Sequence, residues 1–172
     1  LVPIDHSKIP NMVNIDPKFA NPAYDPGNKF TVPWMAGTVG IVIDTDKVKD
    51  DIKGFADVFS GKYARRIVAL DDGREWLTWV LNVQGKDINK ITPEVMEGAR
   101  PTLEKWIKQV KVFDSDSPND KLLTGECDIG VLWSGEAAKL YKENKKYKYV
   151  LPVEGTHQFI DNLAIPKTAR NK

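Results

Sequence analysis

The stretch that decides the fold reads IVALDDGREWLTWVLNV and covers residues 67–83. Its first four residues are apolar and predict a short buried strand. Two aspartates then form an acidic turn, and the residues from Trp76 to Val83 place four apolar side chains at helical spacing before Gly85 ends the helix. Strand, turn and helix in this order are the repeating unit of an α/β domain.

The same alternation continues on both sides of this stretch. Residues 1–30 contain five prolines and predict a long ordered loop with a short helical turn near residues 16–19. Short apolar strands that alternate with helices predict an α/β domain with a mainly parallel sheet flanked by helices. Strands are expected within residues 30–44 and at 67–70, 112–113, 129–132, 147–152 and 158–165, and helices at 55–59, 72–85, 92–110 (kinked or broken at Pro101), 121–124 and 137–144.

Composition excludes several classes of partner. The chain has 172 residues, of which 41% are hydrophobic and 28% charged, and its net charge is +1. A chain this close to neutrality has no field that would recruit nucleic acid or another polyanion. No apolar run approaches the length of about 20 residues that a membrane span needs. The first residues do not resemble a signal peptide and do not begin with Met, so we expect a processed or excised piece, which leaves an exported origin open.

We expect neither a metal nor a cofactor. The single cysteine, Cys127, excludes an internal disulfide and is predicted to be a buried small hydrophobe. The two histidines, His6 and His157, lack the spacing of metal ligands on a helix. The Asp-x-Asp sequence at 114–116 does not predict a calcium loop, because Gly125 occupies the position of the bidentate glutamate.

Three residues follow strands at positions where open α/β sheets bind ligands, namely Asp72, Glu75 and Trp133. Asp72 and Glu75 are candidate ligand carboxylates, but an aspartate followed three residues later by a glutamate is also typical of a capping box. Trp133 directly precedes Ser134, a candidate N-cap, at the end of a predicted strand. It is therefore a candidate for the mouth of a site, although a core position is the alternative.

A second candidate region reads GTHQFIDNLAIP at residues 155–166. If this stretch is extended, Phe159 and Asp161 lie on the same face of a strand. A ring and a carboxylate that point the same way suit an alkyl-ammonium ligand, because the ring attracts the cation and the carboxylate accepts its N–H bonds. The alternative is a half-buried strand in which Asp161 begins a turn with Asn162.

Enzymatic function is not favoured. A pair of carboxylates is also what a glycoside hydrolase needs. However, the chain has no Gly-x-Ser-x-Gly motif, no phosphate loop and no histidine close in sequence to a serine or cysteine nucleophile. A binding protein without catalytic residues is the better interpretation.

Four motifs in order along the chain closely resemble the spermidine/putrescine-binding proteins of polyamine ABC importers. They read YDPGNKFTVPW (24–34), LDDGRE (70–75), LWSGEA (132–137) and FIDNLAIP (159–166). The resemblance implies a two-lobed periplasmic-binding-protein fold of type II, an extracytoplasmic location and a membrane permease as partner. It also implies ligand contacts through Asp72, Glu75, Asp161, Trp133 and Phe159. The family more often has tryptophan where this chain has Phe159, which puts the exact amine preference in doubt.

The resemblance further implies a division of the chain into lobes. Residues 1–44 would form part of the first lobe and a crossing strand, residues 45–160 the second lobe, and residues 161–172 the return strand. Because further segments of the first lobe would be missing, we expect crossing residues such as Val39 to Ile43 to be exposed and to favour dimerisation or strand exchange. A binding protein of the same fold for another cationic or neutral solute is the alternative function.

Overall fold

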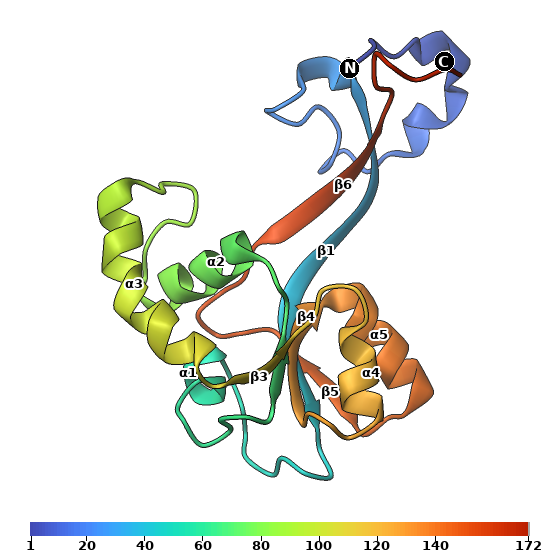
Figure 1. The fold of residues 1–172 in the computed structure, drawn as a ribbon. Coiled ribbons are helices and arrows are strands. Elements are labelled where there is room, and N and C mark those ends of the chain that lie inside the picture. Colours follow the sequence, from blue (N-terminus) through green and yellow to red (C-terminus); the bar gives the residue numbers. More distant parts are fainter. Residues whose placement is uncertain (172) are drawn as a thin grey trace. The chain divides into compact units, whose positions relative to one another are not determined.

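The computed structural model describes residues 1–171 and separates them into two compact units (Figure 1). One unit contains residues 38–157, and the other contains residues 1–37 together with the residues from Gln158 onward. These limits differ by a few residues from the divisions at 44 and 160 expected from the sequence.

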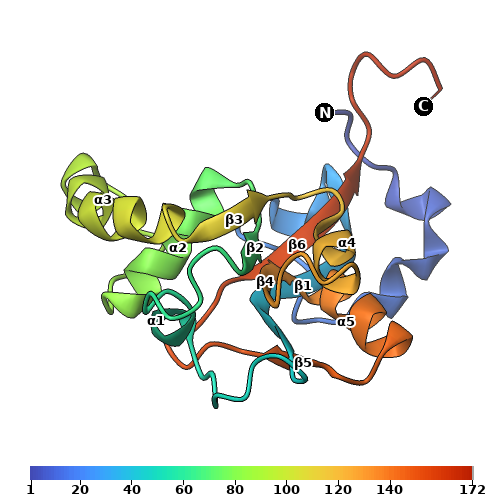
Figure 2. The same ribbon diagram turned by 60° about the horizontal axis from the view of Figure 1, so that its bottom comes forward.

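The larger unit is built on a mixed sheet with the strand order β3-β2-β4-β1-β5. Parallel pairing joins β2 to β3 and to β4, whereas β1 is antiparallel to both β4 and β5. All strands of this path except β1 therefore run in the same direction, and Figure 2 shows β2, β3 and β4 side by side. The prediction of a mainly parallel α/β sheet is confirmed. The strands are β1 (Thr31–Asp44), β2 (Ile67–Ala69), β3 (Val110–Phe113), β4 (Ile129–Trp133) and β5 (Tyr147–Val150).

The long strand β1 corrects one expectation. Val39 and Ile41 are completely buried and Ile43 is 3% exposed, because β4 and β5 pair with β1 on its two sides. The expectation that Val39 to Ile43 are exposed is therefore wrong, whereas dimerisation or strand exchange of the chain stays a prediction. Gly40 is needed in this strand, since a Cβ there would lie 2.5 Å from the ring of Tyr149.

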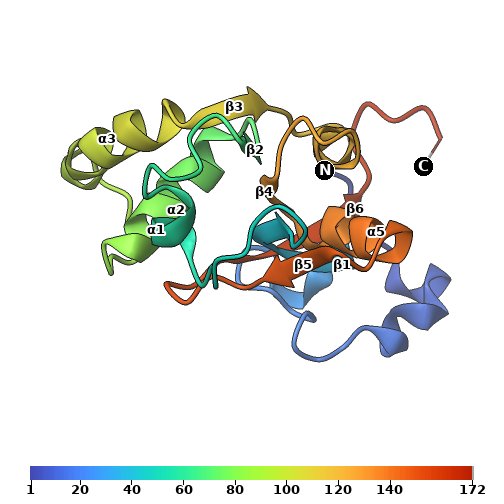
Figure 3. The same ribbon diagram turned by 90° about the horizontal axis from the view of Figure 1, so that it is seen from below.

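Five helices flank the sheet, α1 to α3 on one side and α4 and α5 on the other (Figures 1 and 3). Aromatic residues join α1 and α2, because the rings of Phe55 and Trp79 stack with centroids 5.5 Å apart. Trp106 of α3 stacks on Phe59 at 4.5 Å. These contacts confirm Trp79 and Trp106 as core residues. The helices are α1 (Phe55–Val58), α2 (Gly73–Val83), α3 (Pro93–Ile107), α4 (Pro118–Leu123) and α5 (Ser134–Glu143).

Most differences from the predicted elements concern boundaries. Helix α3 continues through Pro101 without a break and ends at Ile107, so that Val110 opens β3 and does not close the helix. Helices α4 and α5 each begin three residues earlier than predicted. Ser134 is the first residue of α5 and not its N-cap, a position that Trp133 occupies.

The smaller unit is mostly irregular, as five prolines in its first 30 residues predict. It contains three short 3-10 helices, and strand β6 (Gln158–Ala164) pairs with β1. The buried carboxylate of Asp25 accepts hydrogen bonds from the backbone of Phe30 and from the backbone and hydroxyl of Thr31. Burial opposes ionisation of Asp25, but these bonds outweigh it and lower its pKa. The 3-10 helices are η1 (His6–Lys8), η2 (Pro10–Asn14) and η3 (Pro26–Asn28).

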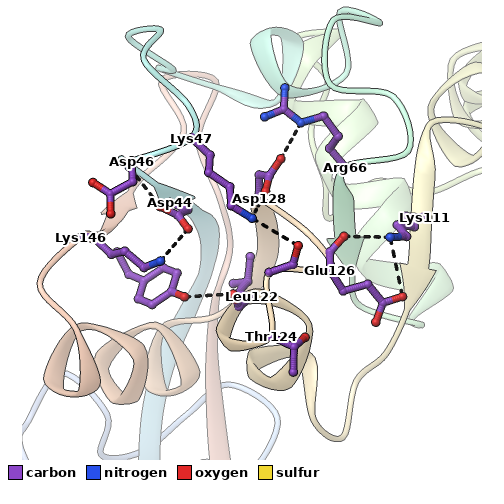
Figure 4. Close-up of polar contacts among 12 residues, drawn as sticks. Asp44, Asp46, Lys47, Arg66, Lys111, Leu122, Thr124, Glu126, Asp128 and Lys146 are labelled. Carbon is purple, nitrogen blue, oxygen red and sulfur yellow. Dashed lines mark hydrogen bonds and ion pairs between the residues drawn. The ribbon is translucent and has the colours of Figure 1, made fainter.

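At the edge where β2, β4 and β5 begin and β1 ends, charged side chains pair with one another. We call this the amino edge, and Figure 4 shows its contacts. Asp128 Oδ1 lies 2.9 Å from Lys47 Nζ, and its Oδ2 lies 2.5 Å from Arg66 Nε. Burial opposes ionisation of Asp128, but the two cations outweigh it and lower its pKa. Asp44, whose side chain is 1% exposed, is paired with Lys146 at 2.9 Å.

Candidate functional site

The opposite edge of the same sheet is acidic. We call it the carboxyl edge, because the parallel strands β2, β3 and β4 end there. The turns after β2 and β3 and the first turn of α2 carry five carboxylates and a single cation, Arg74. The carboxyl ends of parallel strands are where open α/β sheets bind ligands. The acidic residues are Asp71, Asp72, Glu75, Asp114 and Asp116.

Asp72 is the N-cap of α2. Its Oδ1 accepts hydrogen bonds from the backbone N–H groups of Arg74 at 2.8 Å and Glu75 at 3.1 Å. The capping interpretation is therefore confirmed for Asp72. Because only one of its oxygens takes part in these two bonds, capping leaves Asp72 Oδ2 able to accept a further donor.

Glu75 does not complete a capping box with Asp72. Its side chain is 5% exposed, and its Oε1 lies 3.2 Å from Nε2 of His157. Its Oε2 is buried and accepts no hydrogen bond of good geometry among residues 1–171, although the indole N–H of Trp79, also without a well-formed bond, lies close enough to Glu75 to lower the pKa of its carboxyl group. An unpaired buried polar atom costs about 1 to 3 kcal/mol. Of the two residues of the suggested capping box, Asp72 caps the helix and Glu75 does not.

The burial of Glu75 changes its acidity. Burial, and to a smaller degree the nearby Asp72, raise the pKa of Glu75 to about 7 against the opposing effects of Trp79 and Arg74. The carboxyl group therefore titrates near neutral pH. A cation placed beside Oε2 would stabilise the ionised form, which the protein itself stabilises only weakly.

Sequence reasoning missed His157. The residue follows β5 in a segment held to α2 and β1, since Asn82 Nδ2 donates to Gly155 O at 2.9 Å and Thr156 Oγ1 donates to Val39 O at 2.8 Å. Burial lowers the pKa of His157, and its Nδ1 is buried without a partner in the described part of the chain. A lone histidine far from Glu75 in sequence gave no signal of this contact.

Trp133 is the last residue of β4, where it pairs in register with Val39 of β1. It is half-buried and packs against the core. The adjacent Ser134 is involved in holding β1, because its Oγ accepts the backbone N–H of Thr38 at 3.2 Å. Trp133 therefore combines a core contact with a position at the carboxyl edge, and its role in ligand binding stays a prediction.

Phe159 and Asp161 belong to the smaller unit, on β6. Phe159 is half-buried and Asp161 is exposed. The strand continues to Ala164, so the alternative that Asp161 begins a turn with Asn162 is wrong. Asn162 Nδ2 donates to the hydroxyl of Tyr24 at 2.9 Å, a contact that joins two of the four motifs. The ligand role of Phe159 and Asp161 remains a prediction.

Other kinds of site receive no support from the described residues. Among residues 1–171 there is no group of three or more side chains arranged to hold a metal ion. Cys127 is buried, which raises the pKa of its thiol to about 11. No helix in this part of the chain is long and apolar enough to cross a membrane.

Comparison with known proteins gives the class. The family model of the bacterial extracellular solute-binding proteins matches residues 1–172. The chain belongs to this family.

Relatives within the family narrow the comparison. The chain is 36% identical, over 169 residues, to the spermidine/putrescine-binding periplasmic protein 1 of Haemophilus influenzae. This match covers 98% of the chain but 47% of that relative. The chain spans about half the length of the curated relatives it matches.

Solved structures agree with the sequence comparison. A putative spermidine/putrescine ABC transporter protein from Listeria monocytogenes has a TM-score of 0.93 and 32% identity, with 99% of this chain and 53% of that chain covered. A spermidine/putrescine ABC transporter substrate-binding protein from Streptococcus pneumoniae has a TM-score of 0.83 and 36% identity over the same shares of the two chains. The predicted periplasmic-binding-protein fold is confirmed.

Proposed function

We propose that this protein is the extracytoplasmic solute-binding component of an ABC importer and that it binds polyamines such as spermidine and putrescine. The names of its relatives support this proposal, since they are spermidine/putrescine-binding proteins of periplasmic transport systems. In this role the protein has no catalytic residues and delivers its ligand to a membrane permease. The two units correspond to parts of the two lobes of such a protein.

One observation carries the choice of a cationic ligand. In the described part of the chain, Glu75 Oε2 is a buried carboxylate oxygen that makes no well-formed hydrogen bond and is only weakly stabilised by the nearby indole N–H of Trp79, and the carboxyl edge around it is acidic. An ammonium group supplies both the positive charge and the N–H donors that this oxygen lacks. A neutral or anionic solute would leave the cluster of carboxylates uncompensated.

The remaining proposed contacts fit the shape of a polyamine. Such a ligand is a flexible apolar chain with ammonium groups at its ends, so it needs separated carboxylates and flat apolar walls. Asp72 and Glu75 in the larger unit and Asp161 in the smaller one supply carboxylates. Trp133 and Phe159 supply rings, and an ammonium over a desolvated ring contributes about 2 kcal/mol or more.

Calorimetric titration with spermidine and putrescine tests this proposal on the full-length product of the gene. We expect binding of at least one of the two amines. In the variant Asp161→Asn, the loss of a charge-assisted hydrogen bond worth about 1.5 to 3 kcal/mol should weaken binding about 10- to 100-fold.

A matched control removes a carboxylate elsewhere. Asp51 has an exposed side chain 3.4 Å from Lys53 on the surface of the larger unit, and Asp51→Asn should leave the affinity unchanged. An unaltered affinity in Asp161→Asn would remove that residue from the site. Absence of binding to either amine by the unmodified protein would contradict the proposed function as a whole.

A further inference from the structure

Glu75, which lies in the motif LDDGRE, contacts His157, which lies in none of the four motifs. Both side chains are largely buried, with exposures of 5% and 21%, and the distance between Glu75 Oε1 and His157 Nε2 is 3.2 Å. At this distance the carboxyl oxygen and the ring nitrogen are within hydrogen-bonding reach, so one proton between them can be held by either group.

The outer atoms of the pair are also informative. Glu75 Oε2 and His157 Nδ1 are both buried, and neither has a hydrogen-bond partner in the described residues. Their inner atoms face each other and their outer atoms remain available to a third group. With an ammonium group at Oε2, the carboxylate of Glu75 would lie between this cation and the imidazole of His157.

The charges around the pair come from the start of α2. Asp72 raises the pKa of both Glu75 and His157, and Arg74 lowers both. From β1, the backbone carbonyl of Val39 accepts the hydroxyl of Thr156 in the segment before His157. The carboxylate of Glu154 in that segment accepts the backbone N–H groups of Phe55 and Ala56.

We propose that Glu75 and His157 share one acidic proton in the ligand-free protein and that an ammonium group of the ligand replaces this proton. The inference rests on the proposed function, because it assigns the ligand cation to Glu75. On binding, an N–H of the ammonium donates to Glu75 Oε2 and the shared proton passes to solvent. Glu75 is then a carboxylate, His157 is a neutral imidazole, and no covalent bond to the ligand forms. His157 is a positioning residue for Glu75, and it makes cation binding dependent on pH.

The sign of this dependence follows from the raised pKa. Glu75 with a pKa of about 7 is protonated below neutrality, so a cationic ligand has to displace a proton there and binds more weakly. Affinity should fall about 30-fold between pH 8 and pH 5.5. For an ordinary glutamate, whose pKa is near 4.3, the affinity would fall only below about pH 5. The affinity would then be constant between pH 5.5 and pH 8.

Titration calorimetry with putrescine measures this directly on the full-length protein. Both amines of putrescine stay charged between pH 5.5 and 8, since primary ammonium groups titrate near pH 10. Repeating each titration in buffers of different ionisation enthalpy counts the protons released. We expect about 0.9 proton per ligand at pH 6 and about 0.1 at pH 8.

Two variants separate the shared proton from a structural role. Glu75→Gln should flatten the pH profile and weaken binding. His157→Gln keeps a hydrogen-bonding side chain but cannot hold a proton, so it should keep the slope and move its midpoint by about half a pH unit or more. A midpoint that His157→Gln leaves in place, or a flat profile in the unmodified protein, would overturn the inference.

An NMR titration tests the pair without any ligand. The ring resonances of His157 are identified by their loss in His157→Gln. In Glu75→Gln, the His157 pKa should fall further, because the nearby acidic group is lost. Identical titration of His157 in both proteins would overturn the shared proton even if no amine binds, whereas absence of binding together with a shifted titration would contradict only the proposed function.

Discussion

The two edges of the sheet in the larger unit differ in how their buried carboxylates are paired. At the amino edge, the carboxylate of Asp128 has a cation on each oxygen, Lys47 and Arg66. At the carboxyl edge, Glu75 faces a histidine on one oxygen and has no hydrogen-bond partner in the described residues on the other. Burial opposes ionisation at both places, yet the pKa of Asp128 is lowered and that of Glu75 is raised to about 7.

Charged residues at the amino edge stabilise the fold, whereas those at the carboxyl edge belong to the proposed binding site. Ion pairs at the amino edge connect the end of β1 with the starts of β2, β4 and β5, so their charges are neutralised by folding itself. The carboxyl edge carries five acidic groups and one cation, Arg74, so most of its negative charge is left for a cationic ligand to neutralise. A site that is incomplete in the free protein is expected to lower stability there. Variants of the two edges should therefore change stability in opposite directions.

The largest effect is expected at the amino edge. Asp128→Asn leaves Lys47 and Arg66 without their shared carboxylate and should reduce the free energy of unfolding by about 1 to 3 kcal/mol at pH 7. The folded-state pKa of Asp128 is lowered, so its stabilisation is present above the unfolded value of 3.8 and is lost as the pH falls through the folded value. Urea unfolding at pH 7 and pH 3 measures both statements.

The exposed Asp46 of the same edge gives the control. Asp46→Asn removes the same charge from a side chain that solvent covers, and its stability should stay within about 0.5 kcal/mol of the unmodified protein. If Asp46→Asn and Asp128→Asn lose equal stability, the ion pairs of Asp128 are not what stabilises this edge.

At the carboxyl edge the sign reverses. Glu75 has a raised folded-state pKa, so the folded protein binds more protons than the unfolded chain between about pH 4.5 and 7, and stability falls as the pH rises through this range. Glu75→Gln cannot ionise. Without ligand it should therefore be more stable than the unmodified protein by about 1 to 3 kcal/mol at pH 8 and nearly equal to it at pH 5.

Urea unfolding of both proteins at pH 5 and pH 8 measures this difference. His157 acts in the opposite sense, because burial lowers its pKa, and its effect on stability is confined to acidic pH, so the comparison of the two proteins at pH 8 reports on Glu75. A difference between the two proteins that does not change from pH 5 to pH 8 would show that Glu75 is not forced to ionise in a buried place.

The contrast also shows how far the sequence predicts this molecule. Local patterns were sufficient for α2, whose aspartate cap and apolar spacing lie within a dozen residues, and for the apolar strands that alternate with helices. They also indicated a strand within residues 30–44; the exposure expected for Val39 to Ile43 came from the resemblance, and it is wrong because β4 and β5, from much later in the chain, pair with β1 on both sides. The element boundaries at Val110 and Pro118 were not predicted.

The site was predictable to a similar degree. The residue types and the strand ends pointed to Asp72, Glu75 and Trp133, and the structure places all three at the carboxyl edge of one unit. The direction of the Glu75 side chain was not predictable, because a capping box and a buried carboxylate have the same sequence. His157 was not predictable either, since its position depends on hydrogen bonds from Asn82 and Thr156 in the folded chain.

The smallest effect on stability should come from Asp72, where capping and ligand binding use the same carboxylate. Asparagine is as good an N-cap as aspartate, so Asp72→Asn should keep the hydrogen bonds to the backbone of Arg74 and Glu75 and change stability by less than about 0.5 kcal/mol. Asp72→Ala removes the cap and should lose about 1 kcal/mol. If Asp72 Oδ2 also contacts an ammonium group, both variants should weaken polyamine binding by about tenfold, because both remove the charge. Chemical unfolding and calorimetric titration of the two variants separate the roles: full affinity in Asp72→Asn would leave Asp72 as a cap alone, and the neutralisation of ligand charge at the carboxyl edge would then depend on Glu75.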